Sequence, residues 1–362
     1  MRITMSKRSG PFIFAFCFTA SVAAASAFQQ PAASPAPAAP DIKTLGPQVG
    51  EKVPDFNLTD QHGQPRSLAS LMGPKGLLLV FSRSADWCPY CKTQFIEMEG
   101  RVAALRKEGL GLAAITYDPV AVLADFSARR AITYPMLSDQ GSAIIRKYGI
   151  LNTTIQETNA LFGYPFPGTF ILNHDGVVTS RFFENIYQER DTISSLLVRL
   201  GGTVDAPATK TSAPHVEITS YLTDQIAAPG THFSIVLDIV PAPGVHVYAP
   251  GVIGYKPIGL VVQPQAGLVA RDPQFPAAED YFFAPLSEHV PVYQRPFRIV
   301  QDVMLDPSRD ASAALKAITS MTIGATLNYQ ACDDKICFNP QSLPLSWTVG
   351  VRPLDAERVK RP

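Results

Sequence analysis

Two cysteines three residues apart, Cys88 and Cys91, form the most chemically specific pattern in the chain. They follow an apolar run at 77–81 that predicts a buried strand, and they precede good helix formers from Thr93 to about Lys107. The positive end of a helix dipole stabilises a thiolate in the first turn. We therefore expect Cys88 to be the nucleophile that attacks a disulfide, and Cys91 to be the thiol that resolves the mixed disulfide.

Two alternatives remain for this cysteine pair. Zinc also binds two cysteines at this spacing, but the other close pair, Cys332 and Cys337, lies more than two hundred residues away and has a different spacing. An inert structural disulfide is the second alternative, and a strand-to-helix junction argues against it because it exposes the first cysteine. The histidines show no ligand spacing and no cofactor motif stands out, so we expect neither a metal nor a cofactor.

The N-terminus has the composition of a secretory signal peptide. Basic residues precede an apolar stretch at 11–25, and small residues at 25–27 form a cleavage site. Removal of residues 1–27 takes Cys17 with it and leaves two close cysteine pairs, which suits an oxidising compartment. We expect a periplasmic or secreted protein. The net charge is zero and there is no basic block, so nucleic-acid binding has no electrostatic support.

Composition and periodicity divide the chain into two domains. The expected parts are a signal peptide at 1–27, a Pro/Ala-rich linker at 28–48, a first domain at 49–201, a small-residue linker at 202–214, a second domain at 215–351 and a charged, fraying tail at 352–362. Strand and helix patterns alternate in the first domain and end in a helix at 188–200, which predicts an α/β sheet. Short β-rich runs that alternate by two predict an antiparallel β-sandwich in the second domain.

The first domain resembles the redoxin branch of the thioredoxin superfamily, which contains the peroxiredoxin (AhpC/TSA) and TlpA/ResA families. The segments 50–60 and 166–176 carry this resemblance, and it extends from residue 49 to about 200. It implies a thioredoxin-like α/β fold and a cis-proline that faces the cysteines. Pro167 matches that position better than Pro165 does. Such a proline leaves a strand edge on which an extended substrate can lie beside the nucleophile.

The two branches imply different chemistry at Cys88. Peroxiredoxins carry a Thr or Ser three residues before the peroxidatic cysteine and a Pro seven residues before it. Here these positions hold Ala85 and Phe81, and Ser84 is one residue out of register. We therefore expect exchange with protein thiols and disulfides. A thiol peroxidase is the first alternative, because the insert at 120–148 looks peroxiredoxin-like.

The second domain resembles the N-terminal periplasmic domain of the thiol:disulfide interchange protein DsbD. The motif at 329–340, which contains Cys332 and Cys337, and the segment 245–250 carry the resemblance. It implies an immunoglobulin-like sandwich with a redox-active cysteine pair, and 279–283 could supply a loop that caps this pair. A stabilising disulfide between the two cysteines, contributing roughly 2 kcal/mol, is the structural alternative.

These patterns together predict an exported two-domain thiol–disulfide oxidoreductase. A flexible linker would bring the two cysteine pairs to an effective concentration of order mM, so electrons could be relayed between them. A separate membrane electron donor is implied if the protein acts as a reductant. The second alternative is not an enzyme: the sandwich would bind partners, and the first domain would only dock it to a redox chain.

Overall fold

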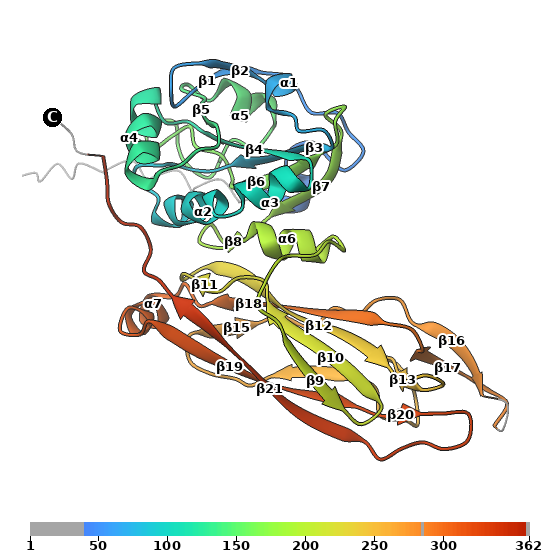
Figure 1. Ribbon diagram of the computed structural model, residues 1–362. Coiled ribbons are helices and arrows are strands. Elements are labelled where there is room, and N and C mark those ends of the chain that lie inside the picture. The colour runs from blue at the N-terminus through green and yellow to red at the C-terminus, as the bar shows by residue number, and fades with distance from the viewer. Residues whose placement is uncertain (1–39, 284–285, 360–362) are drawn as a thin grey trace, which may run out of the picture. The chain divides into compact units, whose positions relative to one another are not determined.

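The computed structural model describes residues 40–283 and 286–359 (Figure 1). The expected signal peptide and the linker up to residue 39 lie outside the described residues. The rest of that linker is not a loose tether, because it contains the short helix η1 (Ile42–Thr44) and buries Leu45. The Arg181 guanidinium donates hydrogen bonds to the carbonyls of Ile42 and Leu45, which fixes this segment on the first domain.

A seven-stranded mixed sheet forms the centre of the first domain, in the order β2-β1-β5-β4-β3-β6-β7. Strands β3, β4 and β5 run parallel to one another. β6 pairs antiparallel with β3, and β7 pairs antiparallel with β6 and so runs in the same direction as β3. The strands are β1 (Asn57–Asp60), β2 (Pro65–Ser67), β3 (Gly76–Phe81), β4 (Leu110–Thr116), β5 (Met136–Ser138), β6 (Gly168–Leu172) and β7 (Val178–Phe183).

Helices cover both faces of this sheet because its central strands are apolar on both sides. Every residue of β3 is buried; Leu78 and Val80 pack into one core, and Leu77 and Phe81 pack into the other. The helices are α1 (Leu68–Leu71), α2 (Pro89–Glu99), α3 (Val102–Lys107), α4 (Val120–Arg130) and α5 (Ala143–Lys147). The run of helix formers expected to continue to about Lys107 is thus interrupted at Gly100, because glycine is a poor helix former.

The helix expected at 188–200 is shorter than the prediction. It begins only after Thr192, whose hydroxyl caps α6 (Ile193–Arg199) by accepting a hydrogen bond from the Ser195 amide. The residues before it form β8 (Arg190–Asp191), which pairs in parallel with the first residues of β12 (Thr231–Pro241) in the second domain. Pairing with a distant strand overrode the local helical pattern.

The second domain packs two main sheets around an apolar core that contains Phe233, Leu237, Ile323 and Trp347. The remaining strands are β9 (Thr209–Ala213), β10 (Val216–Leu222), β11 (Ile226–Ala227), β13 (His246–Tyr248), β14 (Gly259–Val262), β15 (Leu268–Ala270), β16 (Glu279–Phe283), β17 (Glu288–Tyr293), β18 (Phe297–Leu305), β19 (Ser320–Tyr329), β20 (Ala331–Cys332) and β21 (Gln341–Val351), with one helix, α7 (Arg309–Leu315).

The fold class expected from the sequence is confirmed: a thioredoxin-like α/β domain precedes an all-β immunoglobulin-like sandwich. The second linker is shorter than 202–214, because its residues 209–213 form β9 and pair with β10. Within the described residues, no helix is long and apolar enough to cross a membrane.

Candidate active site

Cys88 and Cys91 form a disulfide at the first turn of α2. Cys88 is the N-cap, Pro89 follows it as the first helical residue, and the Cys91 amide donates a hydrogen bond to Cys88 Sγ at 3.3 Å. Proline suits this position because the amide it lacks would have no partner within the helix. The sulfur of Cys88 thus receives both a backbone donor and the positive end of the helix dipole, which stabilise a thiolate when the disulfide is reduced.

The loop before Cys88 is organised by a buried carboxyl group. Asp118 accepts hydrogen bonds from the Ser84 hydroxyl at 2.8 Å and from the Ala85 amide at 2.6 Å. Ser84 Oγ in turn accepts from the amides of Asp86 and Trp87. Burial raises the pKa of Asp118 to about 6, although hydrogen bonds from the loop partly oppose this. The Ser84 hydroxyl is fully buried and is engaged in holding the loop.

An aromatic cluster with a cation at its centre lies beside the disulfide. The Arg83 guanidinium lies 4.7 Å from the ring centre of Trp87 and 4.5 Å from those of Tyr164 and Tyr187. Tyr187 also packs edge-on against Tyr90 of the cysteine motif. The exposed fraction is 1% for Cys88 and 0% for Cys91. The expectation that the strand-to-helix junction exposes Cys88 is therefore wrong, because both cysteines lie in an apolar core cluster against which Trp87 and Tyr90 pack. A client thiol therefore reaches the disulfide only after surrounding side chains move.

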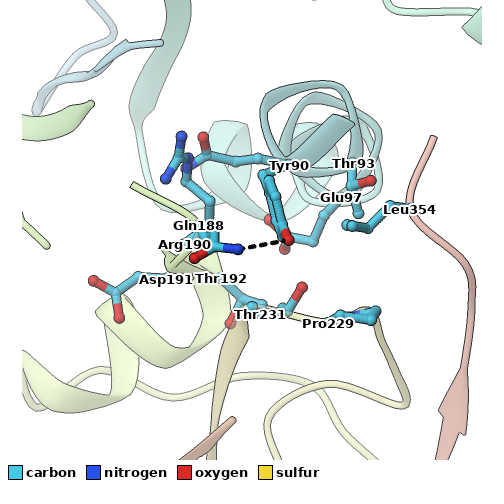
Figure 2. A pocket seen from close by; sticks show the side chains of 12 residues that line it. Tyr90, Thr93, Glu97, Gln188, Arg190, Asp191, Thr192, Pro229, Thr231 and Leu354 are labelled. Atoms are coloured by element: carbon cyan, nitrogen blue, oxygen red, sulfur yellow. Dashed lines mark hydrogen bonds between the residues drawn. The ribbon is translucent and has the colours of Figure 1, made fainter. Parts of the chain in front are cut away.

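Two small pockets lie next to the cysteine motif. Figure 2 shows the first, where Gln188 donates a hydrogen bond to the Tyr90 hydroxyl at 3.1 Å, close to Thr231 of the sandwich. Pro167, the predicted cis-proline, stands directly before β6 and lines the second pocket together with Arg190. Arg190 Nη2 contacts Cys91 Sγ at 3.4 Å, so Arg190 lies between this pocket and the cysteine pair, and the role of Pro167 stays a prediction.

The tail at 352–359, which we expected to fray, instead holds both sides of the cysteine motif. Arg358 forms an ion pair with Asp86 at 2.6 Å, two residues before Cys88. On the other side, the Lys92 side chain is 1% exposed and its ammonium group lies 3.8 Å from Asp355. Burial lowers the pKa of Lys92, and Asp355 partly opposes this. The charged residues of the tail were visible in the sequence, but their partners were not.

The second predicted pair, Cys332 and Cys337, also forms a disulfide. Cys332 is buried in β20, whereas Cys337 is exposed, so an attacking thiol can approach Cys337. The Tyr248 hydroxyl lies 3.4 Å from both sulfur atoms, and burial raises the pKa of Tyr248. The segment 279–283, named as a possible capping loop, is the strand β16 and pairs with β17. Its Tyr281 nevertheless donates a hydrogen bond to Asp334, between the two cysteines, at 2.6 Å.

The two disulfides lie at opposite ends of one strand. β8 contains Arg190, which contacts Cys91, and β8 pairs with the start of β12. At the other end of β12, four residues separate this strand from β13, whose His246 pairs with Cys332. The eleven residues of β12 span roughly 33 Å at the usual rise of a strand. The structure therefore brings together each cysteine pair but not the two pairs with each other.

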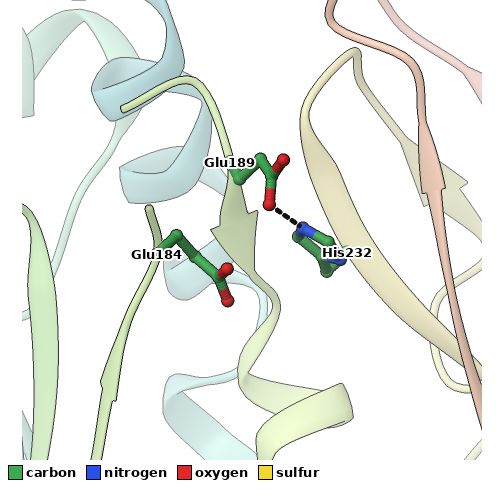
Figure 3. A group of neighbouring side chains, drawn as sticks. All are labelled: Glu184, Glu189 and His232. Atoms are coloured by element: carbon green, nitrogen blue, oxygen red, sulfur yellow. Dashed lines mark hydrogen bonds and ion pairs between the residues drawn. The ribbon is translucent and has the colours of Figure 1, made fainter. Parts of the chain in front are cut away.

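A group of potential metal ligands joins the two domains (Figure 3). Glu184 and Glu189 come from the segment between β7 and β8, and His232 comes from β12. Glu189 lies 3.0 Å from His232 Nε2. Arg271 already occupies the centre, because its Nη2 lies 3.1 Å from Glu184, 3.2 Å from Glu189 and 3.3 Å from His232. The arrangement is that of an ion-pair cluster, and a metal ion would have to displace Arg271.

Comparisons with known protein families give one match in each half of the chain. Residues 49–181 match the AhpC/TSA family, and residues 219–344 match the N-terminal region of the thiol:disulfide interchange protein DsbD. Among solved structures, the peroxidoxin BcpB of Mycobacterium tuberculosis is similar at 24% identity and a TM-score of 0.36, over 39% of this chain and 90% of that one.

Curated relatives come from both branches of the redoxin group. The chain is 29% identical to the chloroplastic peroxiredoxin Q of Arabidopsis thaliana, over 41% of this chain and 64% of that protein. It is 27% identical to the thiol-disulfide oxidoreductase ResA of Geobacillus thermodenitrificans, over 36% of this chain and 66% of that protein. The chain thus spans just under two thirds of each of these two relatives. The chain joins a domain that matches the AhpC/TSA family to a domain that matches the N-terminal domain of DsbD.

Proposed function

We propose that the protein is an exported thiol–disulfide oxidoreductase that exchanges disulfides with protein clients through Cys88 and Cys91. A client thiolate attacks Cys88 Sγ, the bond between the two sulfurs breaks, and Cys91 leaves as a thiolate with the bonding electron pair. The observation that carries this proposal is the position of Cys88 as the N-cap of α2, where its sulfur accepts the Cys91 amide hydrogen bond. Pro167 would shape the edge against which the client lies.

The surroundings of Cys88 favour this exchange over a peroxidase reaction. Ala85 has no hydroxyl to orient a peroxide, and the hydroxyl of Ser84 is buried and bound to Asp118. The relatives include peroxiredoxins, so the peroxidase remains the competing function. It would use the Cys88 thiolate to reduce a peroxide and would leave a sulfenic acid on that sulfur.

Mass-spectrometric mapping of mixed disulfides in a Cys91→Ser variant, isolated from its native compartment, tests the proposal. Without Cys91 the intermediate on Cys88 should persist, and we expect it to be joined to cysteines of other proteins. The matched control is Cys88→Ser, which should trap far fewer clients. If Cys88 is found as a sulfenic or sulfinic acid and not in mixed disulfides, the exchange function is refuted and the peroxidase function is favoured.

We propose that Cys332 and Cys337 form a second redox-active pair, in which the exposed Cys337 is attacked and Tyr248 stabilises the sulfur that is released. Because β12, whose two ends lie toward the two disulfides, spans roughly 33 Å, we expect a relay to Cys88 to run between two chains, or after the domains separate. A mixed disulfide of Cys88 with Cys332 or Cys337 in the trapping experiment would support such a relay. Electrons would come from a separate membrane donor.

The non-enzymatic alternative makes a different prediction for the second pair. If the sandwich only binds partners, a chain with both Cys332 and Cys337 changed to Ser should capture the same clients as the parent. Export is part of the proposal and is tested by the mass of the mature protein, which should begin at Phe28 if cleavage follows residue 27.

A further inference from the structure

Arg190 carries a buried guanidinium group that faces the sulfur of Cys91. Its Nη2 lies 3.4 Å from Cys91 Sγ, and its Nη1 donates to the backbone carbonyls of Tyr187 and Glu189. Its Nε has no hydrogen-bond partner, and among the described residues no carboxylate lies within ion-pair distance of the group. The side chain is therefore a buried cation whose nearest reactive neighbour is the sulfur of a disulfide.

The second domain fixes the backbone of Arg190. The Arg190 amide donates to the Gly230 carbonyl at 2.8 Å, and the Thr192 amide donates to the His232 carbonyl at 3.0 Å. Gly230 adopts a positive φ of 81°, and a Cβ added to it would lie 2.3 Å from the Gln188 carbonyl oxygen. Only glycine allows the two segments to approach this closely. The sandwich thus determines where the guanidinium lies relative to Cys91.

A buried cation without an anionic partner is costly in the disulfide state. Burial, and then the neighbouring Arg83, lower the pKa of Arg190 to about 9, and the charge of Glu184, which lies beyond ion-pair distance, partly opposes this. The group therefore still carries its charge at neutral pH. Reduction of the disulfide changes this balance, because a Cys91 thiolate would supply the missing negative charge at hydrogen-bond distance. The charge of Arg190 therefore favours the reduced state, in which Cys91 is a thiolate, over the disulfide state.

We propose that Arg190, held in place by the sandwich, is a catalytic residue that stabilises the Cys91 thiolate during thiol–disulfide exchange. When an incoming thiolate forms a bond to Cys88 Sγ and the bond between the two cysteines breaks, the electron pair goes to Cys91 Sγ. The guanidinium donates a hydrogen bond to this leaving thiolate, and no proton has to be transferred in the step. This inference rests on the proposed exchange function but names a residue and a domain contact that the cysteine motif alone does not.

A titration of Cys91 tests this role without requiring a client. In a Cys88→Ala background, the 13Cβ chemical shift of labelled Cys91 reports its thiolate fraction, and this readout does not depend on access by a reagent. Replacing Arg190 by Met should raise the titration midpoint by at least one pH unit, since a charge at this distance typically contributes one to three. Arg190→Lys keeps the positive charge, so the Cys91 midpoint in this variant should rise by no more than half as much as in Arg190→Met.

Arg101→Met is the matched control, because Arg101 also bridges to the sandwich, through Asp224 at 2.8 Å, but contacts neither cysteine. It should leave the Cys91 midpoint unchanged. With the two cysteines intact, Arg190→Met should make the disulfide about tenfold harder to reduce in a glutathione buffer, which is about 30 mV.

Three results would overturn the role of Arg190: an unchanged midpoint in both Arg190 variants, equal shifts in the Met and Lys variants, or an equal shift in Arg101→Met. The result of the client-trapping experiment is independent of the result of the Cys91 titration. If trapping yields no mixed disulfides while the midpoint moves as expected, the proposed function fails and the electrostatic role of Arg190 stands. If clients are trapped and the midpoint does not move, the proposed function stands and the electrostatic role of Arg190 fails.

Discussion

The contact between Lys92 and Asp355 allows a sharp test of how the tail is held. The Lys92 ammonium lies 3.8 Å from Asp355, and the side chains are 1% and 6% exposed. Asp355 also accepts a hydrogen bond from Arg130 at 2.7 Å. At this distance two charges attract by about 4 kcal/mol at an effective dielectric constant of 20, and much of this offsets desolvation. Removal of one partner is therefore costly only where the other is left buried and uncompensated.

The two single substitutions should differ for this reason. Asp355→Asn leaves a buried Lys92 ammonium with the Glu357 carbonyl as its hydrogen-bond acceptor, and should lower the free energy of unfolding by about 3 kcal/mol. Lys92→Met replaces the buried stem with one of similar volume and leaves Asp355 paired with Arg130. Its cost should stay within about 1 kcal/mol.

Urea unfolding of the parent, both single variants and the double variant measures these differences. The double variant should recover most of the loss seen in Asp355→Asn, because no uncompensated ammonium remains on α2. If Lys92→Met is as destabilising as Asp355→Asn, or if Asp355→Asn costs less than about 1 kcal/mol, the ion pair does not hold the tail and this reasoning is wrong.

Three further predictions concern single side chains. Burial and the nearby Asp224 raise the pKa of Glu97 to about 8, above its unfolded value, so the parent should lose stability as the pH rises from 5 to 9. Glu97→Gln should show a flatter profile in urea unfolding across that range. Gly230→Ala should speed amide exchange at Arg190 by at least tenfold, because its Cβ would collide with the Gln188 carbonyl. Tyr248→Phe should make the second disulfide about fivefold harder to reduce in a glutathione buffer, because one hydrogen bond to sulfur is lost.

Strands, turns and helices that depend on neighbouring residues in the chain are predicted well from this sequence. The spacing of Cys88 and Cys91 and the apolar run before them are enough to predict a strand, a turn and a helix, and the structure has β3 and α2 there. The period-two pattern of the second domain likewise predicts its long strands. The segment at 188–191 has a helical pattern, but it pairs with β12, whose partner residues Thr231 and His232 lie some forty residues away in the chain. No local signal encodes such a pairing.

The candidate site shows the same division between local and distant information. The cysteines could be found from their spacing alone, whereas Arg190 and Asp118 could not. Both contact the cysteine motif or its loop across more than thirty positions of sequence. An isolated arginine or aspartate in a sequence is most often a solvated surface residue. Only the packing of β8 and of the loop at 82–87 reveals that these two charges are buried beside the cysteine motif.

The chemistry of the contact between the domains bears on why they are fused. A sandwich that only carried a second disulfide on a flexible linker would need no buried charges at the point of contact. Instead Arg101 pairs with Asp224, and Arg199 pairs with Asp302 at 2.9 Å. Burying charges is costly, and replacing them with apolar groups is often neutral for stability, so such contacts mainly specify one arrangement. A fixed arrangement suits a sandwich that positions Arg190 against Cys91 better than it suits a mobile electron carrier.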